Sequence, residues 1–166
     1  MRRLLITAAA VAALGAGVAT AEAAISKGKF EGLVGAKANG DAFGFKVDKS
    51  GRVYSVHFSG VRLSCTDGDT FDSPSKEKPD GEGATEIRTS KNTRFTVDTQ
   101  RRWGFTAANK DAGNGYDVAG TFKSTGNSSK GTLQIKASFD EQNQPDPNGR
   151  VKCDSGPLKW SAKRQK

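Results

Sequence analysis

The sequence predicts an all-β protein, built as a single antiparallel β-sandwich or jelly-roll-like domain with one disulfide, preceded by a signal peptide. Apolar and polar residues alternate with a period of two in eight to ten short segments, which are separated by Gly, Asn, Asp and Pro turns. No stretch after residue 23 shows a sustained helical period. Parallel strands covered on both faces would be continuously apolar, so alternation favours antiparallel pairing.

A first strand and a hairpin are expected near the start of the predicted domain. Residues 29–35 (KFEGLVG) form the first strand candidate, which ends in glycine, and Phe43, Phe45 and Val47 alternate with Gly and Lys in the next. The turn residues 49–51 (KSG) connect this second strand to the strand that starts at residue 52, so the second and third strands are expected to form a hairpin.

Residues 52–65 (RVYSVHFSGVRLSC) are expected to form one long bent strand. The apolar positions change parity at Ser59 and Gly60, which indicates one phase slip. His57, the only histidine, falls on the opposite parity, so its side chain is expected to face solvent. The side chains expected on the apolar face are Tyr54, Val56, Phe58, Val61, Leu63 and Cys65.

Residues 66–92 interrupt the alternation with many charges, prolines and glycines. A short strand at residues 85–88 is expected within them. Loops of this length are uncommon in compact domains and are either functional or mobile. Both a mobile surface excursion and a binding loop therefore remain open.

Alternation returns at Phe95 and Val97 and continues to the end of the chain. Trp103 and Trp160 share parity with apolar neighbours, so both are expected in the core. Further strands are expected at residues 103–107, 116–122, 133–139, 151–153 and 158–162. Turns are expected at residues 109–115, 124–130 and 140–149.

Residues 1–23 have the features of a secretory signal peptide. Arg2 and Arg3 precede an apolar run that ends in small residues, which predicts cleavage after Ala21 or Ala23. The run is alanine-rich and shorter than the roughly 20 strongly apolar residues of a membrane span. A twin-arginine export route is an alternative. The expected product is a secreted or cell-surface-associated domain, residues 24–166, with no transmembrane segment.

The chain carries two cysteines, Cys65 and Cys153, and a formal net charge of +8. In an exported chain the cysteines are expected to form a disulfide. The positive charge favours a cell-wall polymer or another anionic polymer as partner. Alternatively, lysines and arginines keep a secreted β-protein soluble and protect its strand edges. No nucleic-acid-binding motif accompanies the charge, so nucleic acid is not expected as a partner.

Several framework features are similar to those of a broad group of small exported β-sandwich proteins found in soil-type actinobacteria. They are Cys65, Gly-Thr-Phe at residues 120–122, Gly-Thr-Leu at 131–133, Cys-Asp-Ser-Gly at 153–156 and Trp160. The resemblance covers most of residues 28–163. Most members of the group lack an assigned function, so the resemblance implies compartment and fold and assigns no catalytic residue.

Four groups of titratable residues are candidate sites of chemistry. His57 is of the residue type most often used for general acid–base catalysis, but no serine lies in a nucleophile-elbow context that would complete a triad. Asp67, Asp69 and Asp72 provide oxygen ligands without the remaining EF-hand pattern, and with one His and both Cys paired, zinc is disfavoured. No catalytic residue, metal or cofactor is expected. The acidic residues Asp140, Glu141 and Asp146 are a similar, weaker candidate for a cation site. A glycosidase needs two carboxylates facing each other, whereas Asp98, Asp117 and Asp140 each lie singly along the sequence.

Arg101 and Arg102 beside Trp103 are the candidate ligand-binding residues, because arginine next to an aromatic suits anionic or sugar ligands. The expected function is non-enzymatic binding of a cell-envelope glycan or another anionic polymer. Two alternatives remain: an extracellular hydrolase with its site near residues 66–92, and a protein-partner or structural module. The oligomeric state is left open.

Overall fold

A computed structural model of the protein describes residues 24–35, 42–72, 87–109, 114–140, 146 and 148–166. These residues form β-strands and no helix, which confirms the predicted all-β class. None of them belongs to a helix with the length and apolar character of a membrane span. The strands are β1 (Gly28–Val34), β2 (Ala42–Val47), β3 (Val53–Ser59), β4 (Arg62–Cys65), β5 (Thr70–Asp72), β6 (Ile87–Arg88), β7 (Arg94–Phe95), β8 (Arg102–Asn109), β9 (Asn114–Phe122), β10 (Ser128–Phe139), β11 (Val151–Asp154) and β12 (Leu158–Arg164).

All twelve strands belong to one hydrogen-bonded sheet with the order β5-β4-β11-β10-β12-β1-β2-β3-β6. β9 pairs with β10 and β8, and β7 pairs with β3. Every pairing is antiparallel, as predicted from the alternation. β10 is long enough to pair with β9 along one edge and with β12 and then β11 along the other. A separate second sheet, as in a sandwich, is not confirmed.

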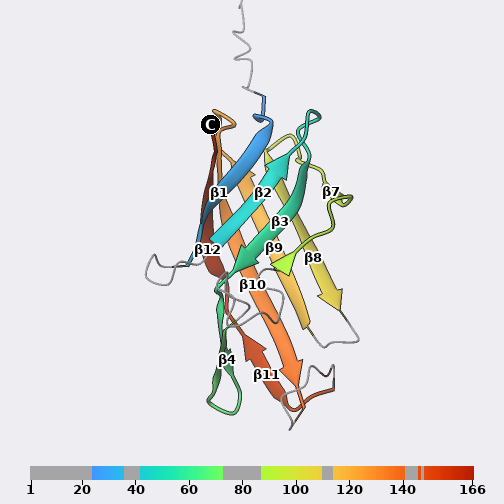
Figure 1. Ribbon diagram of the computed structural model, residues 1–166, viewed down its shortest axis with the longest axis vertical. Coiled ribbons are helices and arrows are strands. Elements are labelled where there is room, and N and C mark those ends of the chain that lie inside the picture. The colour runs from blue at the N-terminus through green and yellow to red at the C-terminus, as the bar shows by residue number, and fades with distance from the viewer. Residues whose placement is uncertain (1–23, 36–41, 73–86, 110–113, 141–145, 147) are drawn as a thin grey trace, which may run out of the picture.

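The sheet curls into two layers that continue into an arm. β1, β2 and β3 lie in front of β8, β9 and β10, and β12 joins the layers at one side (Figure 1). We call this part, the described residues of 24–60, 87–134 and 155–166, the body. The arm comprises the described residues of 61–72 and 135–154, with β4 and β11 beside the end of β10.

Aromatic side chains fill the space between the two layers of the body. Phe45 of β2 stacks on Phe30 with ring centroids 4.9 Å apart and lies 5.0 Å from Trp103 of β8. It also meets Phe43, Phe122 and Trp160 edge-on. Trp103 and Trp160 are 4% and 3% exposed, so their predicted core positions are confirmed.

Two glycines make room for the tryptophans. Trp160, Gly131, Gly120 and Trp103 follow one another across β12, β10, β9 and β8. A Cβ on Gly120 would lie 2.7 Å from both indole rings, and one on Gly131 would lie 1.8 Å from the Ala119 carbonyl oxygen. The large and small residues of this row therefore interlock, because only glycine leaves space for the rings.

The predicted long strand of residues 52–65 is two strands, β3 and β4, separated by a bend at Gly60, where φ is +74°. This confirms the phase slip expected at Ser59 and Gly60. Glycine suits the bend because other residues rarely adopt this backbone conformation. Val61 and Leu63 are buried after it, as the changed parity predicts.

A second irregularity in β3 was not predicted. The register between β2 and β3 shifts at Ser55, whose φ is +51°, so a β-bulge inserts one residue there. Val53 consequently joins the core, and Tyr54 lies on the outer face, where the Arg94 guanidinium sits 4.2 Å from its ring centroid. The expectation that Tyr54 belongs to the apolar face was wrong.

The disulfide predicted between Cys65 and Cys153 is present. The two residues lie directly opposite each other on β4 and β11, with Cα atoms 4.0 Å apart. β4 and β11 share only one further registered pair, Ser64 with Asp154. The disulfide therefore reinforces a short pairing that connects β4, and β5 beyond it, to the rest of the sheet.

Three predicted connections differ in extent. β9 begins at Asn114, inside the turn expected at residues 109–115. β10 begins at Ser128, inside the turn expected at residues 124–130, because its pairing with β12 starts there. The segment 66–92 contains β5, which was not predicted, and β6, which lies inside the strand expected at residues 85–88. The signal peptide and residues 73–86 of that segment lie outside the described residues.

Candidate functional site

His57 is buried rather than solvent-facing, which corrects the sequence-based expectation. Its parity does place it on the outer face of β3, but the side chain is only 5% exposed. The imidazole lies over Gly44 of β2, and its Nε2 atom is 3.5 Å from Oε1 of Glu31 on β1. The outer face at this point is therefore a packed polar layer, in which Glu31 also contacts Lys29 at 2.9 Å.

Among the contacts of the described residues, His57 is not paired with a serine hydroxyl as a base with a nucleophile. Its Nδ1 atom lies 3.2 Å from the carbonyl oxygen of Ser55, while the Ser55 hydroxyl is 3.4 Å from an Arg88 guanidinium nitrogen. A triad needs the second ring nitrogen to face the hydroxyl in an accessible site. The geometry of His57 instead suits a structural contact across three strands.

We predict that Gly44→Ala destabilises the protein by about 1–3 kcal/mol through overpacking. The new Cβ would lie 2.6 Å from Cε1 and Nε2 of His57 and 2.8 Å from the Phe30 carbonyl oxygen. Denaturant unfolding of Gly44→Ala, His57→Ala and the double variant measures the effect. The double variant should lose less stability than the two single losses combined, because removing the ring relieves one of the two clashes. Additive losses would contradict the proposed packing of the ring over Gly44.

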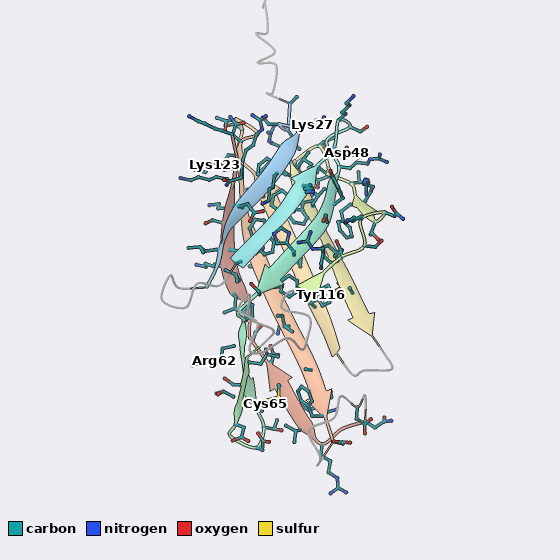
Figure 2. All side chains as sticks on the ribbon, in the orientation of Figure 1. Lys27, Asp48, Arg62, Cys65, Tyr116 and Lys123 are labelled. Atoms are coloured by element: carbon teal, nitrogen blue, oxygen red, sulfur yellow. A yellow bond between two sulfur atoms is a disulfide. The ribbon has the colours of Figure 1, made fainter. Side chains whose placement is uncertain are left out.

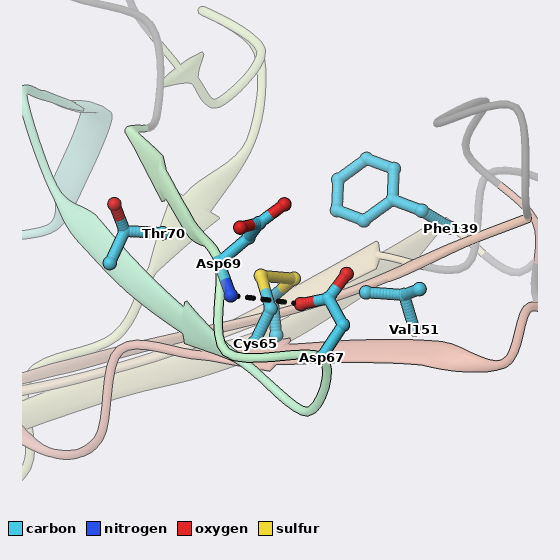
Figure 3. Close-up of a pocket in the computed structure, with 7 residues that line it drawn as sticks. Cys65, Asp67, Asp69, Thr70, Phe139 and Val151 are labelled. Carbon is cyan, nitrogen blue, oxygen red and sulfur yellow. Dashed lines mark hydrogen bonds between the residues drawn. A yellow bond between two sulfur atoms is a disulfide. The ribbon is translucent and has the colours of Figure 1, made fainter.

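A depression of about 250 Å³ lies on the arm, beside the disulfide. Asp67 and Asp69 face Phe139 and Val151 across it (Figure 3). The Asp67 carboxylate accepts a hydrogen bond from the Asp69 backbone N–H, which closes the turn between β4 and β5. Its negative rim disfavours an anionic ligand. No group of three His, Cys, Asp or Glu within the described segments is placed to hold a metal ion.

Arg101 and Arg102 have different environments. Arg101 is 9% exposed, and its carbonyl oxygen accepts a hydrogen bond from the Phe122 N–H. Arg102 points outward from β8 and forms an ion pair with Asp98, with Nε and Oδ2 2.8 Å apart. The structure therefore leaves Arg102, rather than Arg101, on the surface that a ligand can approach.

The turn that holds Arg102 occurs twice in the chain. Residues 45–52 (FKVDKSGR) and 95–102 (FTVDTQRR) share the pattern Phe-x-Val-Asp-x-x-x-Arg. In each, the aspartate accepts a hydrogen bond from the backbone N–H of the arginine, at 3.0 Å for Asp48 and 2.7 Å for Asp98. These hydrogen bonds lower the pKa of both aspartates below the ordinary value. Both carboxylates are thus occupied within their own turns.

Lysines gather on the outer face of β2, β1, β12 and β10, and we call this surface the basic face. Among the described residues, the outer positions of these strands in the body contain a single acidic residue, Glu31. Lys46 is half-buried and the others are exposed. The lysines of the basic face are Lys29, Lys46, Lys130, Lys159 and Lys163.

The register places these lysines next to one another. Lys29 lies directly opposite Lys46. Ser161, the partner of Lys130, is flanked two residues away on each side by Lys159 and Lys163. Diagonal neighbours of this kind are about 7–8 Å apart in an antiparallel sheet, within reach of long side chains. Lys163 lies directly opposite Glu31 on β1, so Lys29, two residues away from Glu31, is a diagonal neighbour of Lys163. The two groups of lysines therefore meet around Glu31.

The body and the arm differ in net charge. Among the described residues, the body contains sixteen Lys and Arg against four Asp and Glu, whereas the arm contains four against six. Figure 2 shows Lys27 and Lys123 at the end of the body farthest from Cys65 of the arm. The electrostatic field of the described residues would therefore attract an anion to the body rather than to the arm.

Comparison of the chain with protein-family models, curated proteins and solved structures found no match. The resemblance to exported actinobacterial β-sandwich proteins thus stays a prediction.

Proposed function

We propose that the protein is a non-enzymatic binding protein for an anionic polymer of the cell envelope, and that the basic face is its binding surface. The observation that carries the proposal is the alignment of five lysines over four adjacent strands, with Glu31 as the only acidic residue among the described outer positions of these strands in the body. Lysine is a flexible point charge, which suits repeated anionic groups along a chain.

The alignment of like charges itself supports binding. Like charges directly opposite each other, as in Lys29 and Lys46, destabilise a sheet, and the Glu31 carboxylate 2.9 Å from Lys29 offsets part of this repulsion. Scattered lysines would protect the surface from aggregation equally well without this repulsion. Anionic groups bound between the lysines would remove the repulsion, so the arrangement favours the bound state.

The proposal includes export and location outside the cell. It is supported by the sequence pattern of residues 1–23 and by the disulfide, which is typical of oxidising compartments. It also includes a sandwich-like interpretation of the body, supported by aromatic contacts between β2 and β8 across the interior. A hydrolase near residues 66–92 and a protein-partner module are the alternatives, and no described contact favours either.

We predict that replacing Lys130, Lys159 and Lys163 with glutamine weakens binding to purified cell-wall polymer about 100-fold. A lysine at an anionic surface contributes about 1 kcal/mol, and three such losses correspond to roughly two orders of magnitude. Co-sedimentation at several salt concentrations measures the effect. The triple variant should also show a shallower salt dependence than the wild type, because fewer counterions are released when it binds.

The matched control replaces Lys49, Lys91 and Lys152, which lie outside the basic face, with glutamine. It removes the same charge, so it should retain most of the binding. Equal loss in both triple variants would show that net charge, rather than the basic face, determines retention. Absence of retention of the wild-type protein at physiological salt would refute the proposed function.

A further inference from the structure

A shallow groove crosses the outer face of β8, β9 and β10 next to the basic face. Its volume is about 370 Å³. The floor consists of the small residues Gly104, Ala119 and Thr132, which lie in register across the three strands. Lys159 of β12 continues this row beyond Thr132, so the floor ends at a lysine of the basic face. The groove spans about 10 Å between β8 and β10, from the usual strand spacing.

The two sides of the groove differ in chemistry. Just outside the lining on one side, Arg102, Thr121 and Lys130 follow one another in register, and Arg102 is in its ion pair with Asp98. On the other side, Thr106, Asp117 and Gln134 line the groove and also follow one another in register. The first side therefore has a net positive charge from Lys130, and the other offers neutral hydrogen-bonding groups around a carboxylate.

Hydrogen bonds fix the polar side of the groove. The Thr106 hydroxyl donates to Oδ1 of Asp117 at 2.5 Å. The Gln134 amide nitrogen donates to both carboxylate oxygens of Asp154 at 2.9 Å, which leaves the amide oxygen of Gln134 as a further acceptor. Asp117 and Gln134 thus present oriented acceptors opposite the cations.

We propose that this groove binds a segment of an acidic glycan, with its carboxylates toward Lys130 and Arg102 and its hydroxyl groups toward Asp117 and Gln134. This inference rests on the proposed function and names the class of polymer. Carboxylate oxygens accept hydrogen bonds from sugar hydroxyls, and the small floor admits a polymer chain lying across the strands.

Asp117 determines the specificity in this proposal. A polymer with anionic groups on every side, such as polyphosphate, would place negative charge against the Asp117 carboxylate. A sugar chain places a hydroxyl there instead. A repulsive group of this kind discriminates between ligands that the lysines attract equally.

Binding of polygalacturonate and inorganic polyphosphate, compared at equal charge concentration, tests the inference, with neutral dextran as a blank. The wild type should bind polygalacturonate more tightly. Asp117→Asn should weaken polygalacturonate binding about tenfold, the effect of losing a charged hydrogen bond, and should strengthen polyphosphate binding. Ala119→Trp, which fills the floor, should weaken polygalacturonate binding at least as much, whereas Ser64→Trp on the arm should not.

Thermal unfolding of each variant checks that it folds, and Asp117→Asn keeps the test valid if Ala119→Trp does not fold. The inference is overturned if the wild type prefers polyphosphate, or if Asp117→Asn changes binding of both polymers in the same direction. If the wild type binds cell wall through the basic face but Asp117→Asn has no effect on binding of either polymer, the inference about the groove is overturned and the proposed function stands. Loss of all polyanion binding by the wild type would instead overturn the proposed function.

Discussion

Replacing Phe45 with alanine should lower the free energy of unfolding by about 3–5 kcal/mol, the range for truncating a buried phenylalanine. The ring is fully buried and contacts five aromatic rings from both layers of the body. Its loss leaves a cavity that the rigid rings of Trp103 and Trp160 cannot fill without moving off Gly120 and Gly131. Denaturant unfolding followed by tryptophan fluorescence measures the change.

Phe95 provides the matched control, because it occupies the position equivalent to Phe45 in the repeated Phe-x-Val-Asp pattern. It is only partly buried, and within the described part of the chain its ring stacks on Phe105, with ring centroids 4.0 Å apart, and on no other aromatic ring. Phe95→Ala should therefore cost less than half as much as Phe45→Ala. Similar losses at both positions would contradict the assignment of Phe45 as the centre of the core.

Parity along the sequence predicted much of the fold because each strand has one apolar face. It located the tryptophans in the core and the bend at Gly60 correctly. It failed at Ser55, because a single inserted residue reverses the parity of everything before it. A bulge depends on the register with the neighbouring strand, and the residues around Ser55 do not by themselves determine that register.

The environment of His57 was unpredictable for a related reason. Glu31, Gly44 and His57 come from three strands and lie in one row only when β1, β2 and β3 pair in the observed register. The imidazole can lie over Gly44 because glycine has no side chain there. By contrast, the repeat at residues 45–52 and 95–102 was visible in the sequence. The spacing of Asp and Arg that its two copies share would have predicted the ion pair of Arg102.

The basic face illustrates what sheet topology adds to composition. Along the chain its lysines look scattered, since Lys29 and Lys46 are far from Lys130, Lys159 and Lys163. They meet because β12 inserts between β1 and β10, which brings the two ends of the domain together. Strand order of this kind is not readable from alternation, so the net charge was predictable but the surface was not.

Replacing Cys65 and Cys153 together with serine should lower the free energy of unfolding by up to about 4–5 kcal/mol. The disulfide joins residues 88 positions apart, and closing a loop of that length restricts the unfolded chain by about this amount in the chain-entropy model. Typical domains are stable by only about 5–15 kcal/mol, so the loss would be large. Denaturant unfolding of the oxidised protein and of the double variant measures it.

A separate measurement tests the disulfide itself. Alkylation and mass measurement of the unreduced protein should detect no free thiol, and two alkylated cysteines would refute the disulfide.

Two roles for the disulfide are distinguished by which part of the domain becomes less stable when it is removed. If it only held β4 to β11, its removal would disorder the arm and leave the body unchanged. The loop that it closes, however, contains β8, β9 and β10, which form one layer of the body. An effect on the unfolded chain therefore lowers the stability of the whole domain. We expect the unfolding midpoint reported by Trp103 and Trp160, which lie in the body, to fall with that of the arm. An unchanged tryptophan midpoint would show that the disulfide acts on the arm alone.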